Sequence, residues 1–248
     1  MSSPIGHADK AAPLQVFQEK ARGRERTMKA SAFLVAVGLA IVPSMTMSQT
    51  KNPVGRPPSE LNRNLLKNGE VEAEGTDSEH VSGWGQKDGL SAAAYGSVGG
   101  EWDWGLSGCP TCGKRYLRLA FAADKHQLSV SQTIDVAHLA ADIDKNAVTA
   151  EVSAYLGGFV DGDTTGQVTA SFQDASGQEL GKIQTEPYDT AKLPKPEKGG
   201  TALVFCHATG KVSSGTRRIV YTWDAHATGD SGDHVGLGDD FSLKLTLQ

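Results

Sequence analysis

Basic residues, aromatic residues and long apolar runs are all scarce in this chain. Lysine and arginine number 24 against 29 acidic residues, and a pI near 5.8 leaves no broad positive field. This balance argues against binding nucleic acid through its phosphates. The apolar run at residues 32–42 is too short for a membrane-spanning helix, which needs about 20 residues. The low aromatic share of 6%, together with 29 glycines, favours strands joined by many turns.

Short catalytic motifs are also missing. The chain has no Gly-x-Ser-x-Gly nucleophile turn, no His-Glu-x-x-His pair and no phosphate-binding loop. Histidines are scattered over predicted strands and loops, at His126, His138, His207, His226 and His234. We therefore predict no catalytic residues and no enzyme. Paired glycosidase acids stay open as an alternative, because their separation of about 5–10 Å is a property of the fold.

The first fifty residues have the order of processing signals. Basic residues precede the apolar run, and small residues such as Thr46 and Ser48 follow it. This order predicts a signal peptide over residues 28–48, cleaved near Ser48, and a secreted or periplasmic protein. Residues 1–27 are either an extended leading region or an overlong start assignment. Residues 49–60 contain three prolines, which predicts a Pro-rich linker.

Alternation of apolar and polar residues recurs from residue 61 onward. It is clearest at residues 148–156, where Val148, Ala150 and Val152 alternate with Thr149 and Glu151. The same pattern covers residues 117–121, 168–173, 219–223 and 241–247. One apolar face per segment is typical of half-buried antiparallel strands. Residues 61–248 are therefore predicted to form one all-β antiparallel β-sandwich, with a single short helical segment at residues 136–146.

Several segments, in this order, resemble a known fold family. They are Asn-Leu-Leu-Lys-Asn-Gly-Glu-Val-Glu at residues 64–72, Gly83-Trp84, Leu-Ser-Val-Ser-Gln-Thr-Ile-Asp-Val at residues 128–136, and Gly-Asp-Asp-Phe-Ser-Leu at residues 238–243. The first resembles the opening strand, and the last the closing strand, of galactose-binding-like jelly-roll domains, which include many carbohydrate-binding modules. More specifically, the chain is similar to bacterial secreted relatives of the F-box-associated, sugar-recognising domain. The resemblance implies a noncatalytic binding sandwich and names no ligand.

The resemblance also implies one structural Ca²⁺. In related carbohydrate-binding modules the Glu of the first-strand motif and the first Asp of the last-strand motif meet at this ion. The corresponding residues here are Glu72 and Asp239. Ca²⁺ takes about six to eight oxygen ligands, so two carboxylates together with backbone carbonyls suit it. The alternative is that both residues are solvated edge charges.

The three cysteines leave three interpretations open. Cys109-Pro110-Thr111-Cys112 has the spacing of a redox pair, a zinc knuckle or a structural disulfide of an exported protein. A redox pair normally opens a helix, whereas a predicted strand follows here. Zinc would need Cys206 and His207, which as neighbours on a strand point to opposite faces. We predict a disulfide between Cys109 and Cys112 with Cys206 as a buried thiol, and pairing of Cys206 with either partner is the alternative.

Aromatic rings are the platforms on which proteins hold the apolar face of a sugar. Trp102 and Trp104 alternate with acids in a Gly-flanked segment and are the first candidates, and Tyr155, on the polar side of its strand, is a further one. The alternative is that one or both indoles cap the core, as Trp84 and Trp223 are expected to do. The segment at residues 225–238, where the F-box-associated domain carries its sugar-reading aromatics, offers only histidines, acids and glycines here.

These observations predict a secreted, noncatalytic, lectin-like carbohydrate-binding β-sandwich whose partner is a glycan or polysaccharide. A structural or protein-interaction module of the cell envelope, without sugar binding, is the alternative. A hydrolase ranks third.

Overall fold

A computed structural model gives the fold. It describes residues 60–73, 76, 80–85, 87–96, 109–122, 125–159, 162–193, 200–229 and 234–248. Contacts divide the chain into two units, Met1–Asn52 and Pro53–Gln248, and every described residue belongs to the second. The predicted signal peptide, the linker up to residue 59, Trp102 and Trp104 lie outside the described residues.

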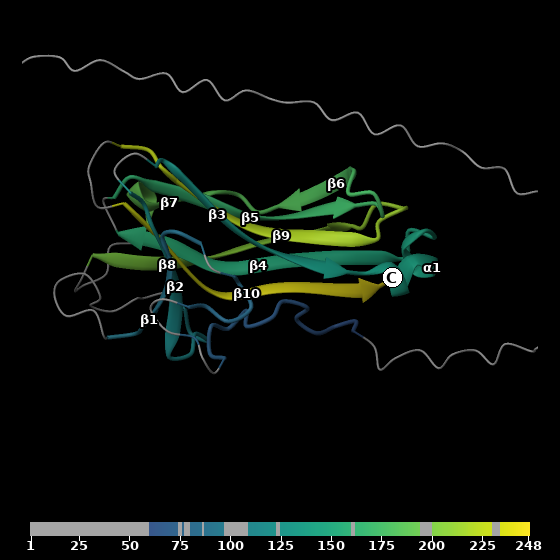
Figure 1. Cartoon of the computed structure of the whole chain (residues 1–248), viewed down its shortest axis with the longest axis horizontal. Helices are drawn as coiled ribbons and strands as arrows, with labels where there is room; N and C mark the ends of the chain where they lie inside the picture. The colour runs from purple at the N-terminus through teal and green to yellow at the C-terminus, as the bar shows by residue number, and fades with distance from the viewer. Residues whose placement is uncertain are drawn as a thin grey trace, which may run out of the picture. The chain divides into compact units, whose positions relative to one another are not determined.

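Two antiparallel sheets face each other, which confirms the predicted all-β sandwich (Figure 1). Sheet A has the order β1(Leu90–Ala94), β2(Arg115–Ala120), β10(Val235–Leu247), β4(Val148–Phe159) and β8(Thr201–Lys211). Sheet B has the order β3(Gln127–Asp135), β9(Arg218–Ala227), β5(Thr164–Gln173) and β6(Glu179–Gln184), and β7(Tyr188–Asp189) pairs with β5. The short helical elements are η1(Ala137–Leu139), α1(Ala140–Ile143) and η2(Thr190–Lys192). None of the helices in the described part of the chain is long and apolar enough to cross a membrane.

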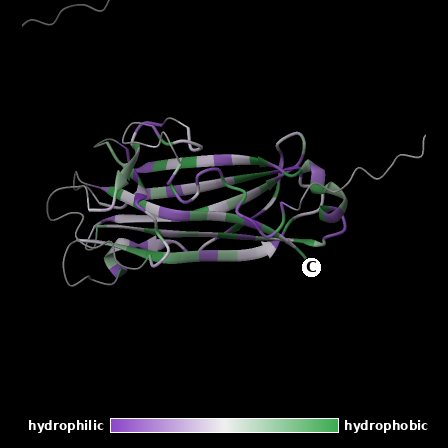
Figure 2. Cartoon of the chain, turned by 90° about the horizontal axis from the view of Figure 1, so that it is seen from below, coloured by the Kyte–Doolittle hydropathy of each residue, from purple (hydrophilic) through white to green (hydrophobic). Residues whose placement is uncertain are grey.

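The core lies between the two sheets and follows from the alternation in sequence. Buried and partly buried residues alternate without a break along β5 and β9, and hydropathy alternates along the strands in Figure 2. Trp223, Tyr221, Phe172 and Phe241 are the largest fully buried side chains. Each such side chain contributes about 1.5–3 kcal/mol by leaving water, so this layer supplies much of the stability.

Trp84 and Trp223 are core residues, as predicted. Their exposed fractions are 4% and 0%, and both rings contact Phe241, at centroid distances of 4.9 and 5.2 Å. The indole N–H of Trp84 donates to the carbonyl of Asn68 at 3.0 Å. Trp84 therefore fastens the segment before β1 to the centre of the sandwich.

The prediction that residues 64–72 open the fold as a strand is wrong. The segment runs beside β10 and bonds to it, for example from the Leu65 amide to the Leu243 carbonyl at 2.9 Å, but it is built of turns and bends. Asn62, Asn68 and Val71 have positive φ angles of 64°, 52° and 58°. These left-handed residues turn the chain away from an extended path, which ends any continuous ladder.

The predicted helical segment at residues 136–146 is present but shorter. It consists of η1 followed by the single turn α1, which ends at Ile143. Asn146, with φ of 58°, turns the chain into β4. The segment buries Val136, Leu139 and Ile143 at one end of the sandwich.

Candidate functional site

The outer face of sheet A, which points away from sheet B, carries a row of aromatic side chains. In the register of the sheet, Asp239 of β10 lies opposite Tyr155 of β4, and Tyr155 lies opposite Phe205 of β8. Ser153 and His207 form the next pair on the same face. Directly opposite residues of antiparallel strands share a face, so three neighbouring strands place these side chains together.

Three rings in this row contact each other. The Tyr155 and Phe205 rings have centroids 5.1 Å apart, and the Phe205 ring stacks on His207 at 5.5 Å with an interplanar angle of 13°. Phe205 is 54% exposed, the largest exposed fraction among the exposed large apolar side chains of the described residues. We call Tyr155, Phe205 and His207 the aromatic row. The stacked rings of Phe205 and His207 are its exposed part, and the partly buried Tyr155 ring is tilted by 48° against Phe205.

Polar side chains flank the aromatic row on the same face. The pair after Ser153 and His207 along β4 and β8 is Glu151 and Thr209, and Lys244 of β10 lies opposite Glu151. All three side chains are exposed. The carboxylate of Glu151, the hydroxyl of Thr209 and the ammonium group of Lys244 therefore lie beside the His207 end of the row. These groups can donate or accept hydrogen bonds.

The other end of this face is apolar and covered. Tyr116, Leu203, Val235 and Leu237 are buried there as a second, smaller cluster, separate from the main core. The partly buried rings of Tyr95, Tyr155 and Phe159 and the two cysteines of the disulfide pack against this cluster. One end of the aromatic row is thus anchored, while Phe205 and His207 stay exposed.

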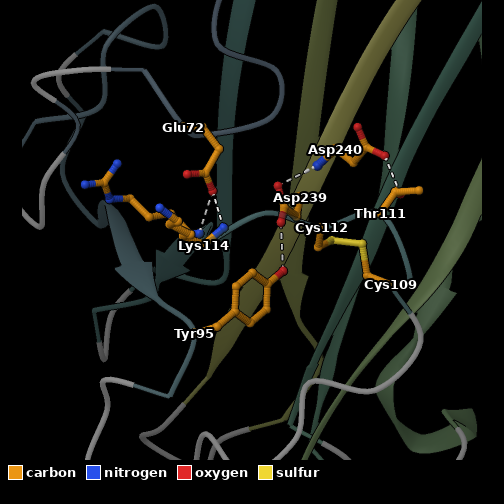
Figure 3. The surroundings of a disulfide bond; sticks show 9 residues. Glu72, Tyr95, Cys109, Thr111, Cys112, Lys114, Asp239 and Asp240 are labelled. Atoms are coloured by element: carbon orange, nitrogen blue, oxygen red, sulfur yellow. Dashed lines mark hydrogen bonds between the residues drawn. A yellow bond between two sulfur atoms is a disulfide. The ribbon is translucent and has the colours of Figure 1, made fainter.

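The two acidic residues predicted to hold Ca²⁺ do come close together. Glu72 Oε1 accepts the backbone N–H groups of Lys114 and Arg115, the second at 2.8 Å. Asp239 is completely buried and accepts from the Tyr95 hydroxyl at 2.7 Å and from the Asp240 amide at 2.7 Å (Figure 3). Glu72 acts electrostatically on Asp239. Asp239 is therefore not the solvated edge charge of the alternative interpretation.

Burial dominates the electrostatics of Asp239. Loss of solvent raises the pKa of its carboxyl to about 7, although the bonds from Tyr95 and Asp240 act in the opposite direction. The neighbouring carboxylates of Asp240 and Glu72 raise this pKa further. A cation between Glu72 and Asp239 would relieve the repulsion between the two. Glu72 Oε1 already accepts two amide hydrogen bonds, so Glu72 Oε2 and the two Asp239 oxygens, which accept one bond each, are the atoms that fit such an ion.

Cys109 and Cys112 form a disulfide beside these acids, on the outer face of sheet A, as the sequence predicts. Cys206 is a free, buried thiol, and burial raises its pKa to about 11. Its side chain belongs to the main core, on the other side of sheet A. Pairing of Cys206 with either partner is thus not the arrangement that the fold adopts.

A hollow lies beside the edge strand β3. It has a volume of about 660 Å³ and is lined mainly by polar and charged residues, among them Arg63, Lys67, Gln132 and Asp135. The one aromatic residue in its lining is Trp84, which is buried. This groove therefore has no exposed ring, and the aromatic row is the better platform for a sugar.

The sequence predicted one member of the aromatic row and missed two. Tyr155 was found because it occupies a polar position of a clearly alternating strand. Phe205 and His207 were missed because most residues at 201–208 are apolar. Both faces of this strand therefore look alike in the sequence, and no alternation is visible. The available signal was the spacing of Phe205 and His207, which are two residues apart and hence on one face. Trp102 and Trp104 lie outside the described residues, so their predicted role stays a prediction.

No protein family matches the chain, and no curated protein is similar to it. Solved structures to which it is similar include TmCBM61 in complex with β-1,4-galactotriose (TM-score 0.41, 16% identity, covering 73% of this chain and 97% of that one). Another is the CBM22-1 xylan-binding domain of Paenibacillus barcinonensis Xyn10C (TM-score 0.39, 16% identity, 77% and 99%). A Stig cyclase from Fischerella sp. TAU has a TM-score of 0.47 at 14% identity, covering 74% and 97%.

The chain is also similar to the enzymatically active domain of tailspike protein 4 of bacteriophage CBA120, of which it spans 21% (TM-score 0.44, 15% identity). Carbohydrate-binding modules are thus among the structures that this chain resembles, and enzymes are as well. These TM-scores are all below 0.5, so the function has to be inferred from the residues of this chain.

Proposed function

We propose that this protein is a noncatalytic carbohydrate-binding sandwich that holds a glycan against the aromatic row on the outer face of sheet A. The observation that carries the proposal is the exposed stack of Phe205 on His207, with the partly buried Tyr155 ring in contact with Phe205 and with Glu151 and Lys244 on the same face. Trp102 and Trp104, which lie outside the described residues, are part of the proposal as further sugar platforms. The proposal also includes a relation to the bacterial secreted relatives of the F-box-associated, sugar-recognising domain.

The physical basis is the shape of a sugar ring. One face of a pyranose consists of C–H groups, which pack on an aromatic ring, while its hydroxyls point outward to polar side chains. Phe205 lies rigidly on a strand and is stacked from one side, so it loses little side-chain freedom when a ligand covers it. Covering its exposed surface also removes apolar area from water.

A hydrolase is less well supported by the described acids. Catalysis of glycoside cleavage needs two carboxylates on either side of one bond, one of them protonated. Burial raises the pKa of Asp239 to about 7, and Glu72 is a second carboxylate close to it. Asp239 has no exposed surface, however, so a sugar cannot reach it without displacing Tyr95 and the disulfide segment.

Ca²⁺ bound by Glu72 and Asp239 is part of the proposal as a structural ion. It would join the segment before β1 to β10 and neutralise the two carboxylates. The proposal also includes export of the protein and cleavage near Ser48, which the order of basic, apolar and small residues before Gln49 predicts. Amino-terminal sequencing of the protein recovered from periplasm or medium should give a start near Gln49, and a soluble protein that retains residues 32–42 contradicts export.

Affinity electrophoresis through gels containing soluble neutral polysaccharides, galactan and xylan among them, tests the binding site. The wild-type protein should be retarded by at least one polysaccharide, and Phe205→Ala and Tyr155→Ala should each weaken binding about tenfold or more, because loss of a contacting ring costs about 1.4 kcal/mol or more. Leu180→Ala is the matched control, because Leu180 is an exposed apolar residue of sheet B, 37% exposed.

If Phe205→Ala and Leu180→Ala are both retarded as strongly as the wild-type protein, the binding site lies elsewhere. Absence of retardation by every polysaccharide, combined with capture of a specific envelope protein that Phe205→Ala abolishes, would favour the protein-interaction alternative instead.

A further inference from the structure

The disulfide lies against a buried carboxylate. The two sulfur atoms of Cys109 and Cys112 and one carboxylate oxygen of Asp239 all lie within 4.8 Å of one another (Figure 3). Asp239 has no exposed surface, whereas both cysteines are only partly buried. A small reductant can therefore reach the sulfurs, while the carboxylate stays fixed beneath them.

Contacts other than the disulfide hold the segment that carries the two cysteines. The Thr111 hydroxyl donates to Asp240 Oδ2 at 2.9 Å, which ties the middle of the segment to β10. The backbone N–H groups of Lys114 and Arg115, directly after the segment, donate to Glu72. Both contacts are independent of the bond between the sulfurs. The two cysteines therefore stay beside Asp239 when that bond is open.

We propose that Cys109, Cys112 and Asp239 form a redox-gated binding site for a thiophilic divalent metal ion, with Zn²⁺ as its representative. In the oxidised protein the two sulfurs are bonded to each other and bind no ion. In the reduced protein the two thiolates and the carboxylate are its three protein ligands. Thiolates select such ions over Ca²⁺ and Mg²⁺, which take oxygen ligands.

The chemistry balances with a dithiol as the reductant. The dithiol gives two electrons and two protons to the Cys109–Cys112 bond, the S–S bond breaks, two thiols form and the dithiol closes to its own disulfide. Metal binding then releases both thiol protons to water, together with the Asp239 proton where that carboxyl is protonated, because thiolates and a carboxylate are the ligands. The buried Asp239 carboxylate gains a cation as its partner, which offsets the cost of its burial.

The geometry suits a tetrahedral ion. With Zn–S bonds of about 2.3 Å and Zn–O bonds of about 2.0–2.2 Å, the ligand atoms of such an ion lie roughly 3.5–3.8 Å apart. The three atoms here already lie within 4.8 Å, so rotation of the cysteine side chains after reduction brings them to these separations. Three protein ligands leave the fourth position to water or to a further ligand.

This site shares Asp239 with the proposed Ca²⁺ site but is distinct from it. The Ca²⁺ site needs Glu72 and takes no sulfur, whereas the metal site proposed here needs both cysteines. Glu72→Gln removes a carboxylate from the first and keeps an oxygen acceptor for the amides of Lys114 and Arg115. The cysteine variants leave Glu72 unchanged. The two proposals can therefore fail separately.

Anaerobic titration with Co²⁺, a spectroscopic substitute for Zn²⁺, tests the proposal in a Cys206→Ala background, which leaves only the two cysteines of interest. A water-soluble phosphine reduces the disulfide, taking oxygen from water to become the phosphine oxide, and is removed before the titration. We expect thiolate-to-Co²⁺ charge-transfer absorption that saturates at one ion per chain, appears only in the reduced protein and is lost when Zn²⁺ is added.

Variants identify the ligands. Cys109→Ser and Cys112→Ser should each abolish the charge-transfer signal at one ion per chain. Loss of a residue that only orients a metal ligand lowers metal affinity by about 10- to 100-fold. Asp239→Asn should lower the affinity for Co²⁺ by more than this, because it removes a ligand. Glu179→Gln, which changes an exposed carboxylate on β6 of the other sheet, is the control and should bind Co²⁺ as the parent does. If Asp239→Asn does not fold, as judged by circular dichroism, Asp239→Glu replaces it and should change the Co²⁺ absorption spectrum.

Two results would overturn the proposal. The first is a reduced, folded protein that shows no thiolate–Co²⁺ absorption. The second is an Asp239→Asn or Asp239→Glu protein with the same affinity and spectrum as the parent, because the carboxylate is then no ligand.

Discussion

Phe205 and Tyr116 lie on the same face of sheet A, yet their surroundings give them different roles. Tyr116 is buried in the apolar cluster at one end of the face, where its ring contacts Tyr95 at a centroid distance of 4.9 Å. Phe205 is 54% exposed, although its ring stacks on His207 and contacts the Tyr155 ring. A buried ring stabilises the sheet, and an exposed, rigid ring is free to contact a ligand.

The same distinction makes Trp102 and Trp104 testable at the residue scale. If they are sugar platforms, Trp102→Ala and Trp104→Ala should each weaken polysaccharide binding about tenfold or more and leave the melting temperature nearly unchanged. If they cap the core, each should cost about 3–5 kcal/mol of stability through the cavity that it leaves. Affinity and melting temperature measured on the same two proteins decide between these outcomes, and a variant that melts far below wild type removes that residue from the proposed site.

Asp144 gives a prediction about pH. Arg217 donates two hydrogen bonds to its carboxylate, at 3.0 and 2.8 Å, and the Gly215 amide donates a third at 3.0 Å. The bonds from Arg217 and then from Gly215 lower the pKa of Asp144 below its ordinary 3.8. The stabilisation is therefore present above pH 3.8 and is lost as the pH falls through the lowered pKa of the folded protein.

Asp144→Asn should accordingly lower the melting temperature at pH 7, and this difference from wild type should shrink at pH values below 3.8. Thermal melts of both proteins at pH 7 and at pH 3 measure it. A difference that is independent of pH would show that the charge of Asp144 contributes nothing.

At the scale of elements, alternation in sequence specified the strands better than the resemblance to known domains did. The strands β4, β5, β9 and β10 all lie where alternation predicts them. Residues 64–72 were predicted as a strand from the resemblance alone, and they form turns. Sequence similarity to a strand does not include the left-handed angles at Asn68 and Val71, which depend on contacts with distant parts of the chain.

Trp84 is one of those contacts, and it leads to a prediction for this segment. Its ring packs on Phe241 of β10 and on Tyr221 of β9, at centroid distances of 4.9 and 6.3 Å, and its N–H bonds the carbonyl of Asn68. Trp84→Ala should therefore cost about 3–5 kcal/mol, because it leaves a cavity and frees the segment. Denaturant unfolding measures the loss, with Leu180→Ala as a surface control that should change stability little. Equal midpoints for the two variants would contradict this role.

At the scale of the whole molecule, the sandwich brings together acids that lie far apart in the sequence. Glu72 comes from the segment before β1 and Asp239 from the last strand, and the Glu72 carboxylate raises the pKa of Asp239 through space. The irregularity in β10 between Asp239 and Ser242 lies at this point, next to Asp240 with its φ of 49°. Bulges of this kind re-aim side chains and are common beside functional sites.

The predicted Ca²⁺ site can be tested through stability. An ion that binds only the folded protein stabilises it by about 2.7 kcal/mol at a hundredfold excess over Kd. Melting in excess Ca²⁺ should therefore occur at a higher temperature than melting in EDTA, and Glu72→Gln should remove most of this difference. Identical wild-type curves in Ca²⁺ and in EDTA would reject the site, whatever the outcome of the Co²⁺ titration.

The sequence by itself determined where most strands lie, which face of each strand is buried, and which two cysteines form the disulfide. Period-two alternation marked the strands because each strand has one face in the core, and Cys109 and Cys112 pair across only two intervening residues. Only the tertiary structure decided which strands are neighbours. The order β10, β4, β8 places Phe205 beside Tyr155. The position of β10 beside β2 brings Asp239 close to the disulfide, which directly precedes β2. Pairing between distant strands depends on the packing of the whole core, which no local pattern contains.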